Sequence, residues 1–150
     1  MEFKNTESWI NRYIEAEMKV SRRLHADTRE GMGIEMTREQ YQVLNLIERT
    51  GQCTSTFLSE SLFVGKSSIT SIVNRMAERG WIGRTQDKED RRVVYLTLTE
   101  EGREFHRQAG LQMQSLVASY LTHFTEDEIE HFITLFEKLA TLMQDQGEGH

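Results

Sequence analysis

The chain contains no proline, only one cysteine and no long apolar run. Without proline, no residue forces a break in a long helix. The single cysteine, Cys53, cannot form an intramolecular disulfide or supply a structural zinc site, which is typical of a reducing compartment. No apolar run approaches the ~20 residues that span a bilayer, and the first seven residues lack the apolar stretch of a signal peptide. We therefore expect a cytoplasmic protein without a membrane partner.

The composition indicates an ordinary globular protein, because 37% of the 150 residues are hydrophobic and 28% are charged. The net charge of −6 by itself argues against a nucleic-acid partner, since phosphate contacts need cations. The charge is unevenly distributed, however. Residues 64–96 hold seven cations and four anions, a net charge of +3, which leaves −9 on the rest of the chain. This asymmetry suits one phosphate-facing lobe on an acidic body.

Helical periodicity predicts six helices, and capping signals mark where several of them begin. Thr37 and Gln40 fit a capping box, in which each side chain satisfies a free backbone N–H, and Thr125 and Glu128 fit a second. Thr54 is placed to cap a short helix. The predicted helices cover about residues 6–29, 38–49, 55–62, 66–79, 100–121 and 126–143.

Most of these helices carry an apolar face that we expect to be buried. In the second and third helices this face comprises Tyr41, Leu44, Ile47, Phe57, Leu58 and Leu62. In the fifth it comprises Phe105, Leu111, Leu116, Val117, Tyr120 and Leu121. The sixth has a strong amphipathic stripe of Ile129, Phe132, Ile133, Phe136, Leu139, Ala140 and Met143.

The fourth helix differs from the others because the side opposite its apolar stripe is rich in small hydrogen-bonding groups. At ~100° per residue the stripe comprises Ile69, Ile72, Val73 and Met76. The opposite side comprises Ser67, Ser71, Asn74, Arg75 and Glu78. Gly80 is placed to form a left-handed cap at the C-terminal end.

A charged turn, a strand and a helix start follow one another between Asp90 and Gly102. The strand is predicted by β-branched and aromatic residues in which Val94, Leu96 and Leu98 alternate with Val93, Tyr95 and Thr97. Polar residues 84–90 link it to a partner strand that begins near Trp81, and Thr99 is placed to cap the next helix.

The order of four helices, a hairpin and two helices predicts a mainly α fold with a small β-hairpin (α+β). A short helix, a turn, a helix with a hydrogen-bonding face and a basic hairpin are typical of a winged helix-turn-helix that binds DNA.

The sequence resembles the multiple-antibiotic-resistance regulator (MarR) family of bacterial transcription factors over nearly its whole length. The most specific match is the hairpin pattern D-x-R, then L-T, then glycine, formed here by Asp90, Arg92, Leu98, Thr99 and Gly102. The fourth helix matches a more generic pattern through Ser67, Ser68, Ile69, Val73, Met76, Glu78 and Gly80.

The resemblance implies a homodimer that binds a pseudo-palindromic DNA operator, often with a small effector between lobe and dimer base. Residues 37–102 would form the winged helix-turn-helix lobe, and residues 1–36 and 103–150 the helical dimerisation region. The chain departs from the family at Gly65, where a serine or threonine often caps the recognition helix, and we expect Ser67 to take over that role.

The residues expected to contact DNA lie on the fourth helix and the hairpin. Paired hydrogen bonds from Asn74 and Arg75 suit base edges in the major groove, and hydroxyl groups suit phosphates. Arg91 and Arg92 at the hairpin tip suit the minor groove, with Asp90 holding Arg92 extended. The complete predicted set is Lys66, Ser67, Ser68, Thr70, Ser71, Asn74, Arg75, Arg84, Lys88, Asp90, Arg91 and Arg92.

Other candidate sites carry weaker signals. Cys53 suggests a redox switch, but it has no second cysteine to resolve a sulfenic acid, so a packing role is favoured. No pair of histidines has metal-ligand spacing on a helix, and we expect no metal or cofactor. Aromatic and methionine residues form a candidate pocket for a small hydrophobic or phenolic effector, namely Tyr13, Met36, Tyr41 and Phe105.

We therefore predict a sequence-specific, homodimeric transcriptional regulator, most simply a repressor released by a small-molecule effector. One alternative is a winged-helix module that binds protein without DNA, and another is a redox-responsive regulator that acts through Cys53. An enzyme is disfavoured, because the sequence has no Ser-His-Asp set, no glycine-rich phosphate loop and no paired carboxylates in an apolar setting.

Overall fold

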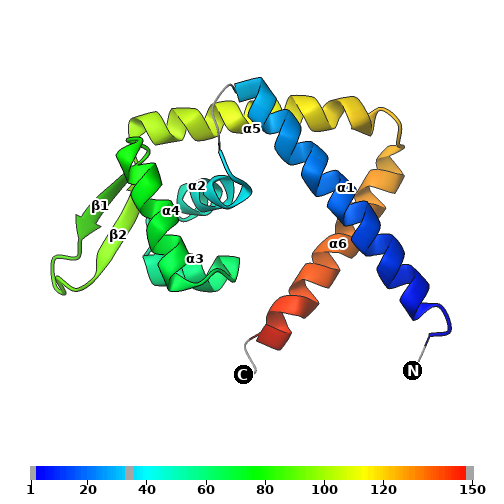
Figure 1. The fold of residues 1–150 in the computed structure, drawn as a ribbon, viewed down its shortest axis with the longest axis horizontal. Coiled ribbons are helices and arrows are strands. Elements are labelled where there is room, and N and C mark those ends of the chain that lie inside the picture. The colour runs from blue at the N-terminus through cyan, green and yellow to red at the C-terminus, as the bar shows by residue number, and fades with distance from the viewer. Residues whose placement is uncertain (1–2, 33–35, 148–150) are drawn as a thin grey trace. The chain divides into compact units, whose positions relative to one another are not determined.

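The computed structural model describes residues 3–32 and 36–147, and these residues form the predicted helices and hairpin (Figure 1). The elements are α1 (Thr6–Met32), α2 (Arg38–Thr50), α3 (Ser55–Leu62), α4 (Lys66–Glu78), β1 (Ile82–Gln86), β2 (Val94–Leu98), α5 (Glu100–Leu121) and α6 (Glu126–Gly147). The chain divides into two compact units, residues 1–113 and residues 114–150. None of the described helices is long and apolar enough to cross a membrane.

The predicted caps are present and explain where three helices begin. At α2, the Gln40 backbone N–H donates to the Thr37 hydroxyl and the Thr37 N–H donates to the Gln40 side chain, both at 3.1 Å. At α3, the Phe57 N–H donates to the Thr54 hydroxyl at 3.1 Å. The second capping box, at α6, is formed in the same way. These local hydrogen bonds satisfy N–H groups that a helix leaves free at its start.

The hydrophobic core lies in the first unit, between α2, α3, α4, the hairpin and the start of α5. Its fully buried members include Val43, Leu44, Ile47, Leu58, Ile69, Met76 and Leu96. One prediction about burial was wrong, because Phe57 is 39% exposed, whereas Tyr41 and Leu62 pack against the core and are partly buried. In the two-turn helix α3, the core contact comes from Leu58 and the half-buried Leu62, and Phe57 lies about 100° around the helix from Leu58.

The hairpin is antiparallel, and its register decides which side chains face the core. Ile82 pairs with Leu98, and Arg84 pairs with Leu96. Ile82, Leu96 and Leu98 are buried, whereas Val94, expected on the same buried face, is exposed near the tip. Directly paired residues project from the same face of a sheet, so Arg84 shares the face of these three core residues.

Cys53 holds a short extended segment against β2. Its N–H donates to the Leu96 carbonyl at 3.1 Å, and the Leu96 N–H donates to the Cys53 carbonyl at 2.7 Å. The side chain is only 5% exposed, and burial raises the pKa of the thiol, opposed by a smaller effect of a hydrogen bond with Thr50. The thiolate is the reactive form, so these features describe a packing residue rather than a redox sensor.

The end of α4 adopts a Schellman motif that directs the chain into the hairpin. Gly80 has φ +82°, as predicted for a left-handed cap. Its N–H donates to the Ala77 carbonyl, and the Trp81 N–H donates to the Met76 carbonyl, both at 3.0 Å. Met76 and Trp81 both belong to the hydrophobic core, in keeping with the apolar contact that accompanies this motif.

Thr99 joins α4, the hairpin and α5 at one point. Its hydroxyl donates to the Gly80 carbonyl at 2.5 Å and accepts the Gly102 N–H at 3.0 Å, while its own N–H donates to the Trp81 carbonyl at 3.0 Å. A Cβ atom on Gly102 would lie 2.1 Å from the Trp81 carbonyl oxygen. The Trp81 ring also stacks on Phe105, with ring centroids 4.1 Å apart. This close approach gives the threonine and glycine of the sequence pattern a structural reason.

Several apolar helix faces remain exposed in the single chain. Leu111, Tyr120 and Leu121 of α5 were expected to be buried and are 52%, 46% and 39% exposed. The α6 stripe is also exposed, through Phe132, Ile133, Leu135, Phe136, Leu139, Leu142 and Met143. In α1 the exposed apolar residues are Trp9, Ile10, Tyr13, Ile14, Met18 and Val20. The periodicity correctly predicted apolar faces, but one chain does not bury them.

We predict that Gly102→Ala destabilises the protein by at least about 1 kcal/mol, because the new Cβ forces α5 away from the Trp81 carbonyl. Urea denaturation would measure the change in the free energy of unfolding. Gly110→Ala is the matched control in the same helix, since nothing lies within 4 Å of its Cβ position, and it should stabilise by about 0.5–1 kcal/mol. Equal effects of the two substitutions would contradict the proposed close contact.

We also predict that Cys53 reacts slowly with Ellman's reagent at pH 7, because its thiol is buried and its pKa is raised. The rate should rise to that of a free thiol when urea unfolds the chain. A folded protein that reacts as fast as glutathione would show that the thiol is accessible.

Candidate nucleic-acid interface

Helix α4 presents the predicted DNA-contacting residues on its exposed face. Its opposite face anchors it to the core through Ile69, Val73 and Met76, which are at most 2% exposed. The seven predicted residues on α4 are all exposed: Lys66, Ser67, Ser68, Thr70, Ser71, Asn74 and Arg75. The helix therefore combines a rigid attachment with an accessible polar surface.

Most of these polar groups are available to an external partner. Within residues 3–32 and 36–147, the side chains of Lys66, Ser67 and Arg75 make no hydrogen bond or ion pair. The prediction that Ser67 caps α4 was wrong, because the cap position is Gly65 and no side chain caps this helix. Thr70 is less available, since its hydroxyl donates to the Lys66 carbonyl at 2.9 Å.

The turn of the hairpin is ordered by an aspartate. Asp87 accepts backbone hydrogen bonds from Glu89 at 2.8 Å and from Asp90 at 3.0 Å, and its own N–H donates to the Val93 carbonyl at 2.9 Å. The N–H groups of Asp90 and Glu89 lower the pKa of the Asp87 carboxyl, because they stabilise its charged form. The turn therefore has a defined conformation although most of its side chains are exposed.

Asp90 holds the Arg92 side chain, as the sequence predicts. The Arg92 Nε donates to Asp90 Oδ1 at 3.1 Å, Nη2 donates to Oδ2 at 3.2 Å, and the backbone N–H of Arg92 donates to Oδ1 at 3.0 Å. Arg92 thereby lowers the pKa of the Asp90 carboxyl. Its side chain remains 91% exposed, so the guanidinium is oriented but still open to a partner.

The lowered pKa of Asp90 decides at which pH this pair is intact. A carboxyl whose folded-state pKa is lowered contributes stability that is fully present above its unfolded value, here 3.8. That contribution is lost as the pH falls through the lowered pKa. The pair is therefore fully charged at neutral pH.

The hairpin also contacts α4 through a hydrogen bond that sequence reasoning missed. Arg84 Nη2 in β1 donates to Asn74 Oδ1 in α4 at 2.5 Å, and both side chains are exposed. Strand alternation was the available signal, because it places Arg84 on the face of the hairpin that packs toward the core. The remaining cations of the hairpin, Lys88 and Arg91, are exposed.

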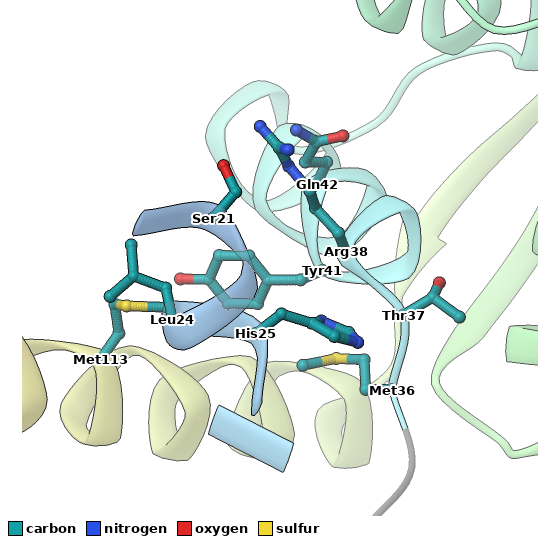
Figure 2. A pocket seen from close by; sticks show the side chains of 9 residues that line it. All are labelled: Ser21, Leu24, His25, Met36, Thr37, Arg38, Tyr41, Gln42 and Met113. Carbon is teal, nitrogen blue, oxygen red and sulfur yellow. The ribbon is translucent and has the colours of Figure 1, made fainter. Parts of the chain in front are cut away.

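A pocket of about 250 Å³ lies between α1, α2 and α5 within the first unit (Figure 2). Its lining residues are Ser21, Leu24, His25, Met36, Thr37, Arg38, Tyr41, Gln42 and Met113. Leu24, Met36, Tyr41 and Met113 supply apolar groups, and the Arg38 guanidinium supplies a positive charge at the edge, 4.0 Å from the Glu17 carboxylate.

Two of the four residues predicted for an effector pocket, Met36 and Tyr41, line this pocket. Phe105 does not line it, because its ring is buried against Trp81. Tyr13 lies on the exposed face of α1 and is 47% exposed. An aromatic contact supports one wall of the pocket, since the Tyr41 ring stacks on His106 with centroids 6.1 Å apart.

The family model that matches the chain is that of the MarR family, over residues 36–94. The uncharacterized HTH-type transcriptional regulator YwhA of Bacillus subtilis is 31% identical over 98 residues, which cover 65% of this chain and 70% of that protein. The HTH-type transcriptional repressor MdtR of B. subtilis is 30% identical over 105 residues, which cover 70% of this chain and 68% of that protein.

Solved structures carry the same fold. The YusO protein from B. subtilis has a TM-score of 0.66 and 26% identity, and the match covers 94% of this chain and 99% of that one. A MarR mutant from Escherichia coli complexed with operator DNA has a TM-score of 0.74 and 24% identity, over 93% of this chain and 99% of that one. The winged helix fold, the matched family model and the relatives agree: the chain belongs to the MarR family and is a DNA-binding transcriptional regulator.

Proposed function

We propose that the protein is a homodimeric, sequence-specific repressor whose α4 enters the major groove of an operator while the hairpin reaches the adjacent minor groove. The observation that carries this proposal is the arrangement of α4 and the hairpin in the winged helix lobe. It joins an exposed polar face of α4 to a hairpin whose Arg92 guanidinium is held by Asp90. This combination matches the two contacts that a winged helix makes with duplex DNA.

The predicted residues divide into two roles. Asn74 and Arg75 project from the middle of α4, where paired donors and acceptors reach base edges, so they are the candidates for reading sequence. Phosphates are the natural partners of Lys66, Ser67, Ser68, Ser71 and Lys88. Arg91 and Arg92 at the hairpin tip suit the negative potential of a narrow minor groove.

Homodimerisation explains the exposed apolar helix faces. The α6 stripe alone exposes Phe132 at 64% and Met143 at 64%, and a soluble monomer rarely exposes contiguous apolar surface of this kind. A second copy of the same chain offers the same apolar faces in return. Two recognition helices would then contact successive major grooves ~34 Å apart on one side of the duplex.

An effector in the pocket beside Tyr41 would release the operator by favouring another spacing of the two lobes. The pocket exceeds the roughly 150 Å³ of a cavity that holds benzene. Its apolar lining with one guanidinium suits a small aromatic anion. Two relatives are named as repressors, MdtR and the homoprotocatechuate degradative operon repressor of E. coli, which supports repression as the direction of control. Binding would shift the population of lobe spacings by the ligand's difference in affinity for them.

A winged-helix module that binds protein instead of DNA is the alternative. It would leave the ordered Asp90–Arg92 pair and the positive charge of residues 64–96 without a role. We favour DNA binding in the cytoplasm without enzymatic activity, in keeping with relatives that are transcriptional regulators.

We predict that Arg92→Ala weakens binding to a duplex that the protein selects from random DNA, by roughly tenfold at low salt. The slope of log K against log salt should flatten by about 0.9 for each phosphate that the variant no longer neutralises. Fluorescence anisotropy of a labelled duplex measures both. Arg107→Ala is the matched control, because Arg107 is exposed but paired with Glu104 on α5, and it should leave affinity unchanged. Unchanged affinity in Arg92→Ala would favour the protein-binding alternative.

We predict that benzoate binds the pocket and that benzyl alcohol, its neutral counterpart, binds more weakly. Arg38→Met should weaken benzoate binding roughly tenfold, since a hydrogen bond to a charged group contributes about 1.5–3 kcal/mol, and should leave benzyl alcohol unaffected. Isothermal titration calorimetry measures both affinities. Equal affinity for benzoate in both proteins would remove Arg38 from the site.

A further inference from the structure

We propose that Arg84 determines which base Asn74 reads, by holding the Asn74 carboxamide so that only its NH2 group is offered to DNA. This inference rests on the proposed function, in which the exposed face of α4 enters the major groove. The contact that carries it is the 2.5 Å hydrogen bond from Arg84 Nη2 to Asn74 Oδ1. Arg84 acts here as a positioning residue, and Asn74 is the residue that touches the base.

The hairpin register places Arg84 beside α4. Arg84 pairs with Leu96, whose side chain is 1% exposed, and lies two residues after the buried Ile82 on the same face of the hairpin. Leu96 is itself held by two backbone hydrogen bonds with Cys53. Position 84 therefore has little freedom to shift, and a long side chain there reaches from the edge of the core to the exposed face of α4.

The chemistry of the pair allows only one orientation of the amide. A guanidinium has five N–H donors and no acceptor, whereas a carboxamide has one oxygen acceptor and one NH2 donor group. Arg84 can therefore bind the Asn74 oxygen and would repel the NH2 group. An isolated asparagine turns its amide freely, but Asn74 has its oxygen committed to the hairpin and its Nδ2 left for another partner.

This orientation changes the base that Asn74 prefers. A free asparagine reads adenine with both ends of its amide, because Oδ1 accepts from N6 while Nδ2 donates to N7. Oδ1 has a second lone pair, but the bond to Arg84 turns this oxygen toward the hairpin and leaves the NH2 group as the end of the amide offered to DNA, so Asn74 acts as a donor. Guanine presents two adjacent acceptors in the major groove, O6 and N7, and is the base that best matches a donor alone. The structure thus points to guanine opposite Asn74.

The test uses the full-length protein and the duplex that it selects from random DNA. Every single-base variant of one half-site is measured by competition anisotropy, and Asn74→Ala identifies the position that Asn74 reads as the one whose preference it abolishes. We expect guanine at that position for the natural chain. Arg84→Met should move the ratio of guanine to adenine affinity toward adenine by about tenfold, at that position only, because it frees Oδ1.

Four further variants separate this role from a general effect. Arg84→Lys keeps a donor and should keep the guanine preference, whereas Arg84→Ala should behave as Arg84→Met, so that the result does not depend on one variant. Adding Arg84→Met to Asn74→Ala should produce no further shift in base preference. Lys88→Met removes a hairpin cation that has no contact with Asn74 and should weaken all duplexes alike.

The outcomes distinguish this inference from the proposed function. If Arg84→Met weakens every duplex by the same factor, or if the natural chain prefers adenine at the Asn74 position, the inference is overturned while DNA binding stands. If the natural chain discriminates no sequence at all, the proposed function and the inference fail together.

Discussion

The close approach of α5 to the Trp81 backbone fixes the positions of α4 and the hairpin, the two elements proposed to contact DNA. Thr99 bonds to the carbonyl of Gly80 and to the N–H of Gly102, and the space at Gly102 admits no side chain. The end of α4, the start of β1 and the first turn of α5 are therefore fixed against one another. As a result, α4 and the hairpin are attached to one another through these contacts and through the shared hydrophobic core.

Attachment of the hairpin to α4 matters because the proposed mode of DNA recognition needs contacts from both elements at once. Backbone pairing with Cys53 fixes β2, and hydrogen bonds to Asp90 fix Arg92. The hairpin is therefore already ordered before any DNA is bound. Groups that are held in place before binding lose less conformational entropy on binding. The acidic remainder of the chain, with a net charge of −9 outside residues 64–96, disfavours other ways of approaching the duplex.

The sequence was most informative where structure depends on near neighbours. The caps at Thr37, Thr54, Thr99 and Thr125 form as predicted, since each involves residues at most three positions apart. The pairing of Asp90 with Arg92 is local in the same way. Apolar periodicity also predicted the helices and the hairpin.

Features that depend on distant segments or on other molecules could not be predicted in the same way. The contact between Arg84 and Asn74 depends on how the hairpin is placed against α4. Strand alternation indicates the face of the hairpin on which Arg84 lies, but it does not indicate which residue of α4 lies opposite. The wrong burial predictions for Leu111, Tyr120 and Leu121 have a different origin. Periodicity shows that a helix has an apolar face, but it does not show whether the same chain or another covers it.

Two such lobes, paired through their apolar helices, should bind one duplex together. Sedimentation equilibrium of the protein with a short duplex that it has selected gives the number of chains on each duplex. We expect two 17.6 kDa chains on each duplex, and a dimer of the same chains without DNA. A single chain on each duplex, or a monomer that binds no sequence in preference to bulk DNA, would show that recognition by a paired lobe is wrong.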